Sequence, residues 1–120
     1  MARNEDGFTL LEMLAVLAIM TILIAIAVGF NAGARVRAAD AAARSNIQVA
    51  VPAFEAYRLD NSGTYSGMTL RRLQTTYSRG IRNIAVVSAR PASYCVRSRV
   101  NGRTWYKLGP AGAITTTRCR

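Results

Sequence analysis

Apolar side chains occupy almost every position from Phe8 to Phe30. As an α-helix this run extends about 34 Å, which is enough to cross a hydrocarbon core of about 30 Å. Its only charged residue is Glu12, near the start. Because an unpaired charge in hydrocarbon costs several kcal/mol, Glu12 needs a partner or a function. The pattern therefore predicts a membrane-spanning helix with one carboxylate that must be explained.

An amphipathic pattern follows over residues 31–60. Apolar residues recur there at helical intervals, at Ile47, Val51, Phe54 and Tyr57. Pro52 has no N–H donor, so we expect it to kink the helix or to start a new turn. The sequence Asp60-Asn61-Ser62-Gly63 is a strong turn signal and predicts the end of the helix.

Residues 61–120 carry shorter patterns. Thr69 predicts the cap of a short helix that continues to Tyr77. Four runs have the character of strands: Asn83–Ala89, Tyr94–Val100, Arg103–Leu108 and Ala113–Arg118. The pair Asn101-Gly102 predicts a two-residue hairpin between the second and third runs. We expect an antiparallel sheet of three or four strands, packed on the second half of the long helix.

Together these patterns predict an α+β chain, in which a long N-terminal α-helix with a hydrophobic first half packs on a small antiparallel β-sheet head. A domain this small buries a modest core and benefits from a covalent link. Cys95 and Cys119 form an even pair, which in an exported chain predicts a disulfide. It would close a loop of roughly 25 residues and contribute about 3 kcal/mol. Two cysteines and no histidine do not make a zinc site, so we expect no metal and no cofactor.

The apolar run has three interpretations. The first is a plain transmembrane anchor. The second is a secretory signal peptide cleaved at Ala25-Ile26-Ala27, which fits poorly because the flank contains Glu5 and Asp6 beside Arg3 and because the run is long for such a peptide. The third comes from a resemblance carried by the residues around Glu12.

The sequence from Gly7 to Ile19, Gly-Phe-Thr-Leu-Leu-Glu-Met-Leu-Ala-Val-Leu-Ala-Ile, resembles the N-terminal signature of type IV pilins and type II secretion pseudopilins. In that family a short polar leader ends in Gly, Phe usually follows, and Glu is the fifth residue after the cut. The resemblance implies that prepilin peptidase cleaves after Gly7 and that the new amino terminus of Phe8 is methylated. It also implies that Glu12 pairs with the terminal ammonium of a neighbouring subunit during assembly. Phe8 and Glu12 are four residues apart, so a pairing within one subunit is a further possibility.

The resemblance implies a pilin-like fold with four segments. These are a prepilin leader at 1–7, a hydrophobic transmembrane and filament-core helix at 8–30, the amphipathic half of the helix at 31–60 and a β-rich head at 61–120. A disulfide that secures the C-terminal region also agrees with the family. In addition, the head resembles pilin-like proteins of Gram-positive bacteria through Asn-Ser-Gly-Thr-Tyr at 61–65, Tyr-Cys at 94–95, Gly-Arg-Thr-Trp at 102–105 and the C-terminal Cys.

One position departs from the family pattern. Many members have Pro about twenty-two residues into the mature helix, whereas this chain has Gly29 there, followed by Gly33. Glycine weakens a helix by about 1 kcal/mol but keeps its hydrogen bond. Residues 28–33 are therefore either a soft point that melts in the filament or only the stretch where the helix leaves the bilayer.

Residues that carry catalysis are scarce. The chain has no histidine, no acid beyond Asp60 and no glycine-rich phosphate loop. We expect no enzymatic activity, and the resemblance makes this chain the substrate of an enzyme.

The C-terminal half is strongly basic. The formal charge is +10, and the stretch from Asn61 to Arg120 contains eleven basic residues and no acid. Such a head attracts DNA, teichoic acids, acidic polysaccharide or an acidic partner subunit. Basic residues interleave with aromatic ones on the predicted hairpin, as in single-stranded nucleic-acid grooves. The candidate polyanion-binding residues are Arg97, Arg99, Arg103, Trp105 and Lys107. The alternative is that the arginines only solvate the head.

The sequence therefore predicts a structural subunit, a pilin or pseudopilin, of a type IV pilus-like filament. The implied partners are other copies of the chain, prepilin peptidase and the pilus assembly machinery. The subunit is expected in the cytoplasmic membrane before assembly and in an extracellular filament at the cell surface afterwards. Two alternatives stay open, a DNA-binding minor pilin of a DNA-uptake filament and a permanently membrane-anchored extracytoplasmic domain that binds polyanions.

Overall fold

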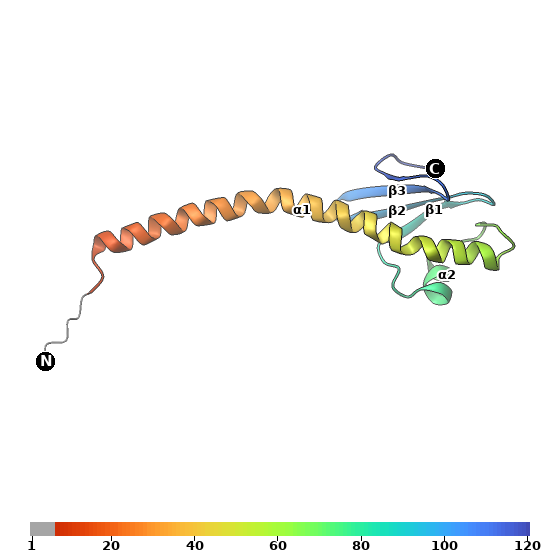
Figure 1. Ribbon diagram of the computed structural model, residues 1–120, viewed down its shortest axis with the longest axis horizontal. Helices are drawn as coiled ribbons and strands as arrows, with labels where there is room; N and C mark the ends of the chain where they lie inside the picture. The colour runs from red at the N-terminus through yellow and green to blue at the C-terminus, as the bar shows by residue number, and fades with distance from the viewer. Residues whose placement is uncertain (1–6) are drawn as a thin grey trace. The chain divides into compact units, whose positions relative to one another are not determined.

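The computed structural model describes residues 7–120, and residues 1–6 of the predicted leader lie outside the described residues. The elements are α1 (Leu10–Asp60), α2 (Leu70–Arg72), the π-helix η1 (Leu73–Tyr77), β1 (Ile84–Ala89), β2 (Tyr94–Val100), β3 (Arg103–Gly109) and β4 (Ile114–Thr115). The chain divides into two compact units, one up to Arg35 and one from Val36 to Arg120. The second unit contains the sheet, and Figure 1 shows the order of the elements. This is the α+β, pilin-like fold that the sequence predicts.

The first unit consists of the start of α1, and its described side chains are all exposed. By length and composition, α1 is the one helix within residues 7–120 that is able to cross a membrane. Gly29 and Gly33 both lie inside the helix, which continues without a break through residues 28–33.

Pro52 lies inside α1, and the helix continues past it to Asp60. Of the two outcomes predicted at Pro52, the new turn is therefore wrong, and the kink stays a prediction. Pro52 cannot donate a hydrogen bond to the carbonyl of Gln48, and both residues are exposed, so water is able to satisfy that carbonyl. The neighbouring Ala53 and Phe54 are buried and hold this part of α1 against the core.

The four strands form one antiparallel sheet in the order β1-β2-β3-β4. The predicted hairpin is confirmed, since Asn101 and Gly102 both have positive φ, as a type I′ turn requires. The last strand is shorter than predicted, because β4 ends at Thr115. Beyond it the tail must cross β3 to bring Cys119 to Cys95 on β2, so it cannot continue the pairing. The predicted short helix begins at its cap, Thr69, but changes to a π-helix after Arg72.

The core lies between one face of the sheet, α1 and the α2–η1 segment. Its largest buried side chains include Phe54 and Tyr57 of α1, Tyr65 of the following loop and Tyr94 of β2. The ring of Tyr94 makes edge-to-face contacts with Phe54 and Tyr65, each with centroids 4.9 Å apart. Such pairs contribute about 0.5–1.5 kcal/mol beyond their buried area.

We expect Tyr94→Phe to stabilise the protein by about 1 kcal/mol. The Tyr94 hydroxyl is buried and has no hydrogen-bond partner within residues 7–120, and a buried unpaired hydroxyl costs about 1–3 kcal/mol. The phenylalanine ring keeps both aromatic contacts. Thermal unfolding followed by circular dichroism measures the change, and a lower melting temperature for Tyr94→Phe would contradict it.

Candidate functional site

The start of α1 is a capping box built by Thr9 and Glu12. The Glu12 backbone N–H donates to Thr9 Oγ1 at 3.2 Å, and the Thr9 backbone N–H donates to Glu12 Oε2 at 3.3 Å. The Thr9 hydroxyl also lies 3.4 Å from Glu12 Oε2. In the single subunit Glu12 thus has a local partner. Sequence reasoning missed this role, although the Thr-x-x-Glu spacing before an apolar run is its signal.

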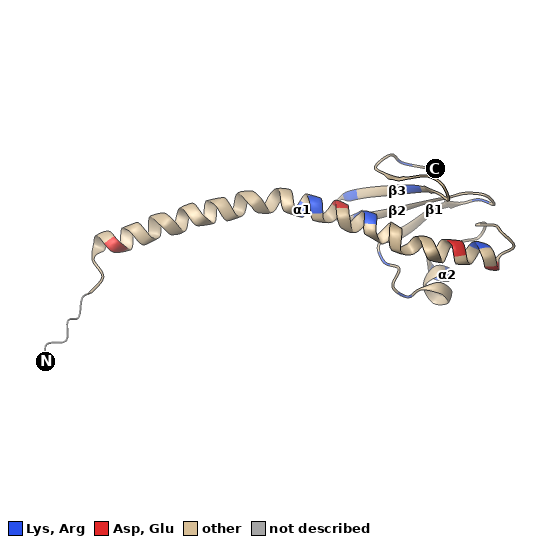
Figure 2. Cartoon of the chain, in the orientation of Figure 1, with Lys and Arg blue, Asp and Glu red and all other residues tan. Residues whose placement is uncertain are grey.

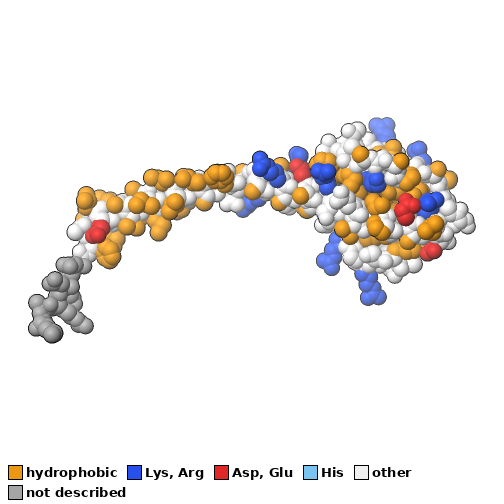
Figure 3. Space-filling view, viewed as in Figure 1, with side chains coloured by type: hydrophobic (Ala, Val, Ile, Leu, Met, Phe, Trp, Pro, Cys, Tyr) orange, Lys and Arg blue, Asp and Glu red, His pale blue; other side chains and the backbone are white. Residues whose placement is uncertain are grey.

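Large apolar side chains surround this carboxylate. Phe8 is 75 % exposed, and the apolar side chains of α1 up to Phe30 are also exposed in the subunit. Figure 3 shows hydrophobic side chains along the visible face of this unit. Glu12 is the only charged residue of α1 before Arg35. Because exposed apolar surface of this extent is unfavourable in water, it requires lipid or other apolar helices as its surroundings.

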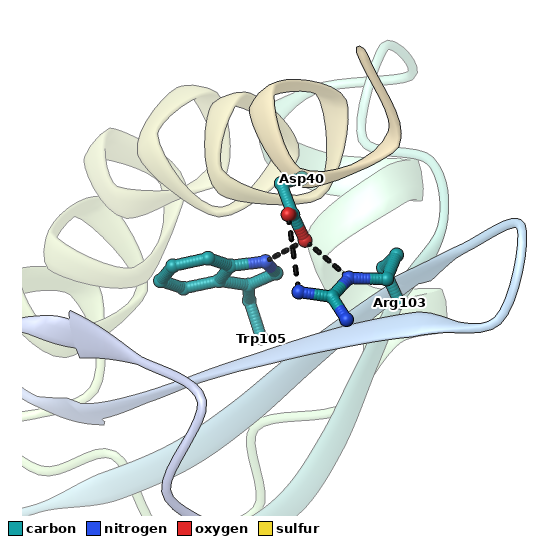
Figure 4. Close-up of polar contacts among 3 residues, drawn as sticks. All are labelled: Asp40, Arg103 and Trp105. Atoms are coloured by element: carbon teal, nitrogen blue, oxygen red, sulfur yellow. Dashed lines mark hydrogen bonds and ion pairs between the residues drawn. The ribbon is translucent and has the colours of Figure 1, made fainter. Parts of the chain in front are cut away.

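A second polar cluster joins α1 to the hairpin (Figure 4). Asp40 of α1 accepts hydrogen bonds from Arg103 Nε at 2.7 Å and Nη2 at 3.1 Å, and from Trp105 Nε1 at 2.9 Å. The guanidinium of Arg44 lies 5.1 Å from the centre of the Trp105 ring. Sequence reasoning missed the Asp40–Arg103 pair because 63 residues separate its members.

Asp40→Asn is expected to reduce the dependence of stability on acid pH. The hydrogen bonds from Arg103 and then from Trp105 lower the pKa of Asp40. A carboxyl whose folded pKa is depressed adds stability above its unfolded pKa of about 3.9, and this stability is lost as the pH falls through the folded value. Thermal unfolding between pH 7 and pH 2 measures the effect. Arg103→Ala should reduce the same dependence, and an unchanged acid limb in Asp40→Asn would contradict the prediction.

The other two acids of the second unit also have partners. Glu55 forms an ion pair with Arg58 at 3.1 Å and accepts a hydrogen bond from the Tyr65 hydroxyl. Burial, followed by the hydrogen bond to Glu55, raises the pKa of Tyr65 to about 12, so its hydroxyl stays a donor at neutral pH. Asp60 accepts from the Tyr77 hydroxyl at 2.9 Å. As Figure 2 shows, every described acid lies on α1.

The predicted polyanion-binding residues lie on one hairpin but on two faces of the sheet. Val96 and Ser98 face α1, since Val96 belongs to the core and Ser98 accepts a hydrogen bond from Asn46 of α1. Arg97 and Arg99 alternate with them and are exposed on the opposite face.

Across the hairpin, three of the predicted residues share the α1 side. Trp105 pairs with Ser98, and Lys107 pairs with Val96. Arg103 binds Asp40 of α1 beside Trp105, and Lys107 donates to the Gly112 carbonyl. The structure therefore brings Arg97 and Arg99 together and keeps both apart from the other three.

The predicted disulfide is present. Cys95 and Cys119 are bonded, with their Cα atoms 5.8 Å apart. Cys95 has the same orientation as Arg97, on the face away from α1. The bond therefore fixes the C-terminal segment, with Arg118 and Arg120 on either side of Cys119, to the sheet beside Arg97.

Comparisons with known proteins agree with the helix start and the fold. Residues 2–28 match the family described as the prokaryotic N-terminal methylation motif. The chain is 32 % identical over 117 residues to the type IV wide pilus major component PilA4 of Thermus thermophilus. That match covers 96 % of this chain and 89 % of the relative. No solved structure matches the chain.

The fold and the helix start define a pilin-like protein. The match to the Thermus thermophilus pilus component over nearly the full length of the chain identifies the family. The chain belongs to the type IV pilin family, which is a family of structural subunits. The resemblance to pilin-like proteins of Gram-positive bacteria stays a prediction.

Proposed function

We propose that the chain is a prepilin that is cut after Gly7, methylated on the new amino terminus of Phe8 and polymerised through α1. One observation carries the proposal, namely that Glu12 is the single charge in the exposed apolar part of α1, before Arg35, and lies four residues after Phe8. The match to the N-terminal methylation motif supports it. The segments 1–7, 8–30, 31–60 and 61–120 then act as leader, filament core, amphipathic half and head.

Cleavage changes the surroundings of Glu12. It creates a terminal ammonium on Phe8, next to the Thr9 cap that holds the Glu12 carboxylate in the single subunit. In an apolar filament core, an ammonium of one subunit and a carboxylate of the next attract each other far more strongly than in water. Either charge alone would be costly there. Glu12 would thus exchange its local cap for the amino terminus of a neighbour and set the register of assembly.

The proposed partners follow from this route. The membrane holds the subunit through α1, prepilin peptidase and the assembly machinery act on it there, and copies of the chain form the extracellular filament. Mechanical shearing of the cells tests this. The chain should sediment with the sheared filaments. Gly7→Asp replaces the residue directly before the proposed cut, so this variant should stay in the membrane fraction. Recovery of the wild-type chain only from membranes would contradict the proposal and favour a permanent anchor.

A second function, binding of DNA by the head, is favoured by the charge distribution. Residues 61–120 contain eleven basic residues and no acid, and the three acids of α1 in this unit all have partners. A filament of such heads would present uncompensated positive charge at its surface. This would suit a minor pilin of a DNA-uptake filament as well as an anchored polyanion-binding domain.

A further inference from the structure

We propose that the sheet face turned away from α1 is a binding site for single-stranded nucleic acid. We call this the outer face, and its binding residues are Arg97, Arg99, Tyr106, Arg118 and Arg120. The proposal rests on the second function above, binding by the basic head, and it does not depend on cleavage or assembly.

The strand register places the first three residues together. Arg97 of β2 pairs directly with Tyr106 of β3, and Arg99 pairs with Thr104. Residues that pair directly in an antiparallel sheet point to the same face, so the Tyr106 ring lies beside the Arg97 side chain. Arg97 and Arg99 are two residues apart on one strand, about 6.8 Å along it. They also line a shallow pocket of about 190 Å³ with Asn83 and Ala85.

The disulfide adds two further cations. Cys95 precedes Arg97 by two residues on the same face, and its bond to Cys119 holds the C-terminal segment there. Arg118 and Arg120 are both exposed. Sequence reasoning grouped Arg97 and Arg99 with Arg103, Trp105 and Lys107, whereas the disulfide holds the segment that carries Arg118 and Arg120 near them.

No described acid opposes this charge. Asp40, Glu55 and Asp60 all belong to α1 and bind groups on that side of the sheet or in the adjoining loops. A second copy of the head offers the same engaged acids, so self-association leaves the outer face uncompensated. The surface therefore fits an anionic chain better than another copy of itself.

Tyr106 decides which anionic chain fits best. Its side chain is half-buried, so part of it stays exposed on the face that carries Arg97. Stacking on such a ring requires an accessible base, which single-stranded nucleic acid has and acidic polysaccharide lacks.

The test measures binding of a fluorescent oligothymidylate to the full-length chain in nonionic detergent, by anisotropy over a series of salt concentrations. Arg97→Ala/Arg99→Ala and Arg118→Ala/Arg120→Ala should each weaken binding about tenfold or more. Each pair should also reduce the slope of log K against log salt by about 1.4, because each phosphate contact in a single strand contributes about 0.7. Tyr106→Leu should weaken binding about tenfold with the slope unchanged.

The matched control is Arg71→Ala/Arg79→Ala, which removes two exposed arginines from other parts of the head. It should change the affinity less than twofold. An equal loss of affinity in this control would show that diffuse positive charge, and not the outer face, causes the binding, although DNA binding by the head would stand. If the wild-type chain does not bind the oligonucleotide, both the outer-face site and DNA binding by the head are wrong. Heparin and unlabelled oligonucleotide are compared as competitors of the labelled strand. If heparin displaces it equally well and Tyr106→Leu does not change the affinity, the face binds acidic polysaccharide and the proposal is wrong.

Discussion

Glu12→Gln is expected to reduce filament assembly at least 100-fold while the head stays folded. The change removes the carboxylate but keeps the shape of the side chain, so a terminal ammonium would enter the apolar filament core without a counter-charge. Breaking a buried ion pair in this way costs about 3–5 kcal/mol, and 2.7 kcal/mol already corresponds to about a factor of 100. The yield of sheared filaments, normalised to the amount of subunit, measures the effect.

Thr9→Ala separates assembly from helix capping. Glu12 has two roles, the cap that it shares with Thr9 in the single subunit and the proposed pairing in the filament. Loss of a cap costs about 0.5–2 kcal/mol and affects only the start of the helix. Thr9→Ala should therefore assemble nearly as well as the wild type. Equal losses in Thr9→Ala and Glu12→Gln would mean that the cap explains the effect and that the pairing is absent.

Gly109→Ala should destabilise the head by about 3 kcal/mol. A Cβ at position 109 would overlap Cζ, Cε1 and the hydroxyl of Tyr94, whose ring lies directly over this glycine. Tyr94 is only 1 % exposed and lies between Phe54 and Tyr65, so its ring has no free space to enter. Overpacking a core costs about 1–3 kcal/mol, and displacement of this ring places the change at the upper end. The melting temperature should fall by roughly 10–20 °C.

Two variants test the cause of that loss. Gly80→Ala is the matched control, since its Cβ would lie 3.6 Å from Ser78 Oγ, which is an ordinary contact. It should change the stability by less than about 0.5 kcal/mol. In a Tyr94→Ala background, Gly109→Ala should add little further destabilisation, because the ring that it displaces is gone. A full additive loss in the double variant would show that Tyr94 is not the reason.

Much of the fold was predictable because its signals are local. The Asn101-Gly102 pair requires two positive φ values in succession, and the structure has both. Thr69 caps its helix because its Oγ1 accepts a hydrogen bond from the Arg72 N–H, three residues away. The end of α1 at Asp60 and the strand Tyr94–Val100 also follow from short patterns.

The candidate sites needed the tertiary structure. A two-residue hairpin pairs Val100 with Arg103, so Arg99 faces Thr104 across the sheet and Arg103 has the opposite orientation. This division of the basic residues could be predicted from the sequence once the hairpin was assigned. The contact of Asp40 with Arg103 and Trp105 could not be predicted, because nothing near Asp40 in the chain indicates which strand crosses it. The course of the tail after β4 also depends on the disulfide.

The intact mass and N-terminal residue of the protein purified from its own cells show most directly whether it is a processed filament subunit. We expect a chain that begins at Phe8 and carries one methyl group on its amino terminus. A chain that begins at Met1 would be a permanent anchor, and one that begins at Val28 would be a secreted domain. Either result would contradict the filament subunit proposed for this pilin.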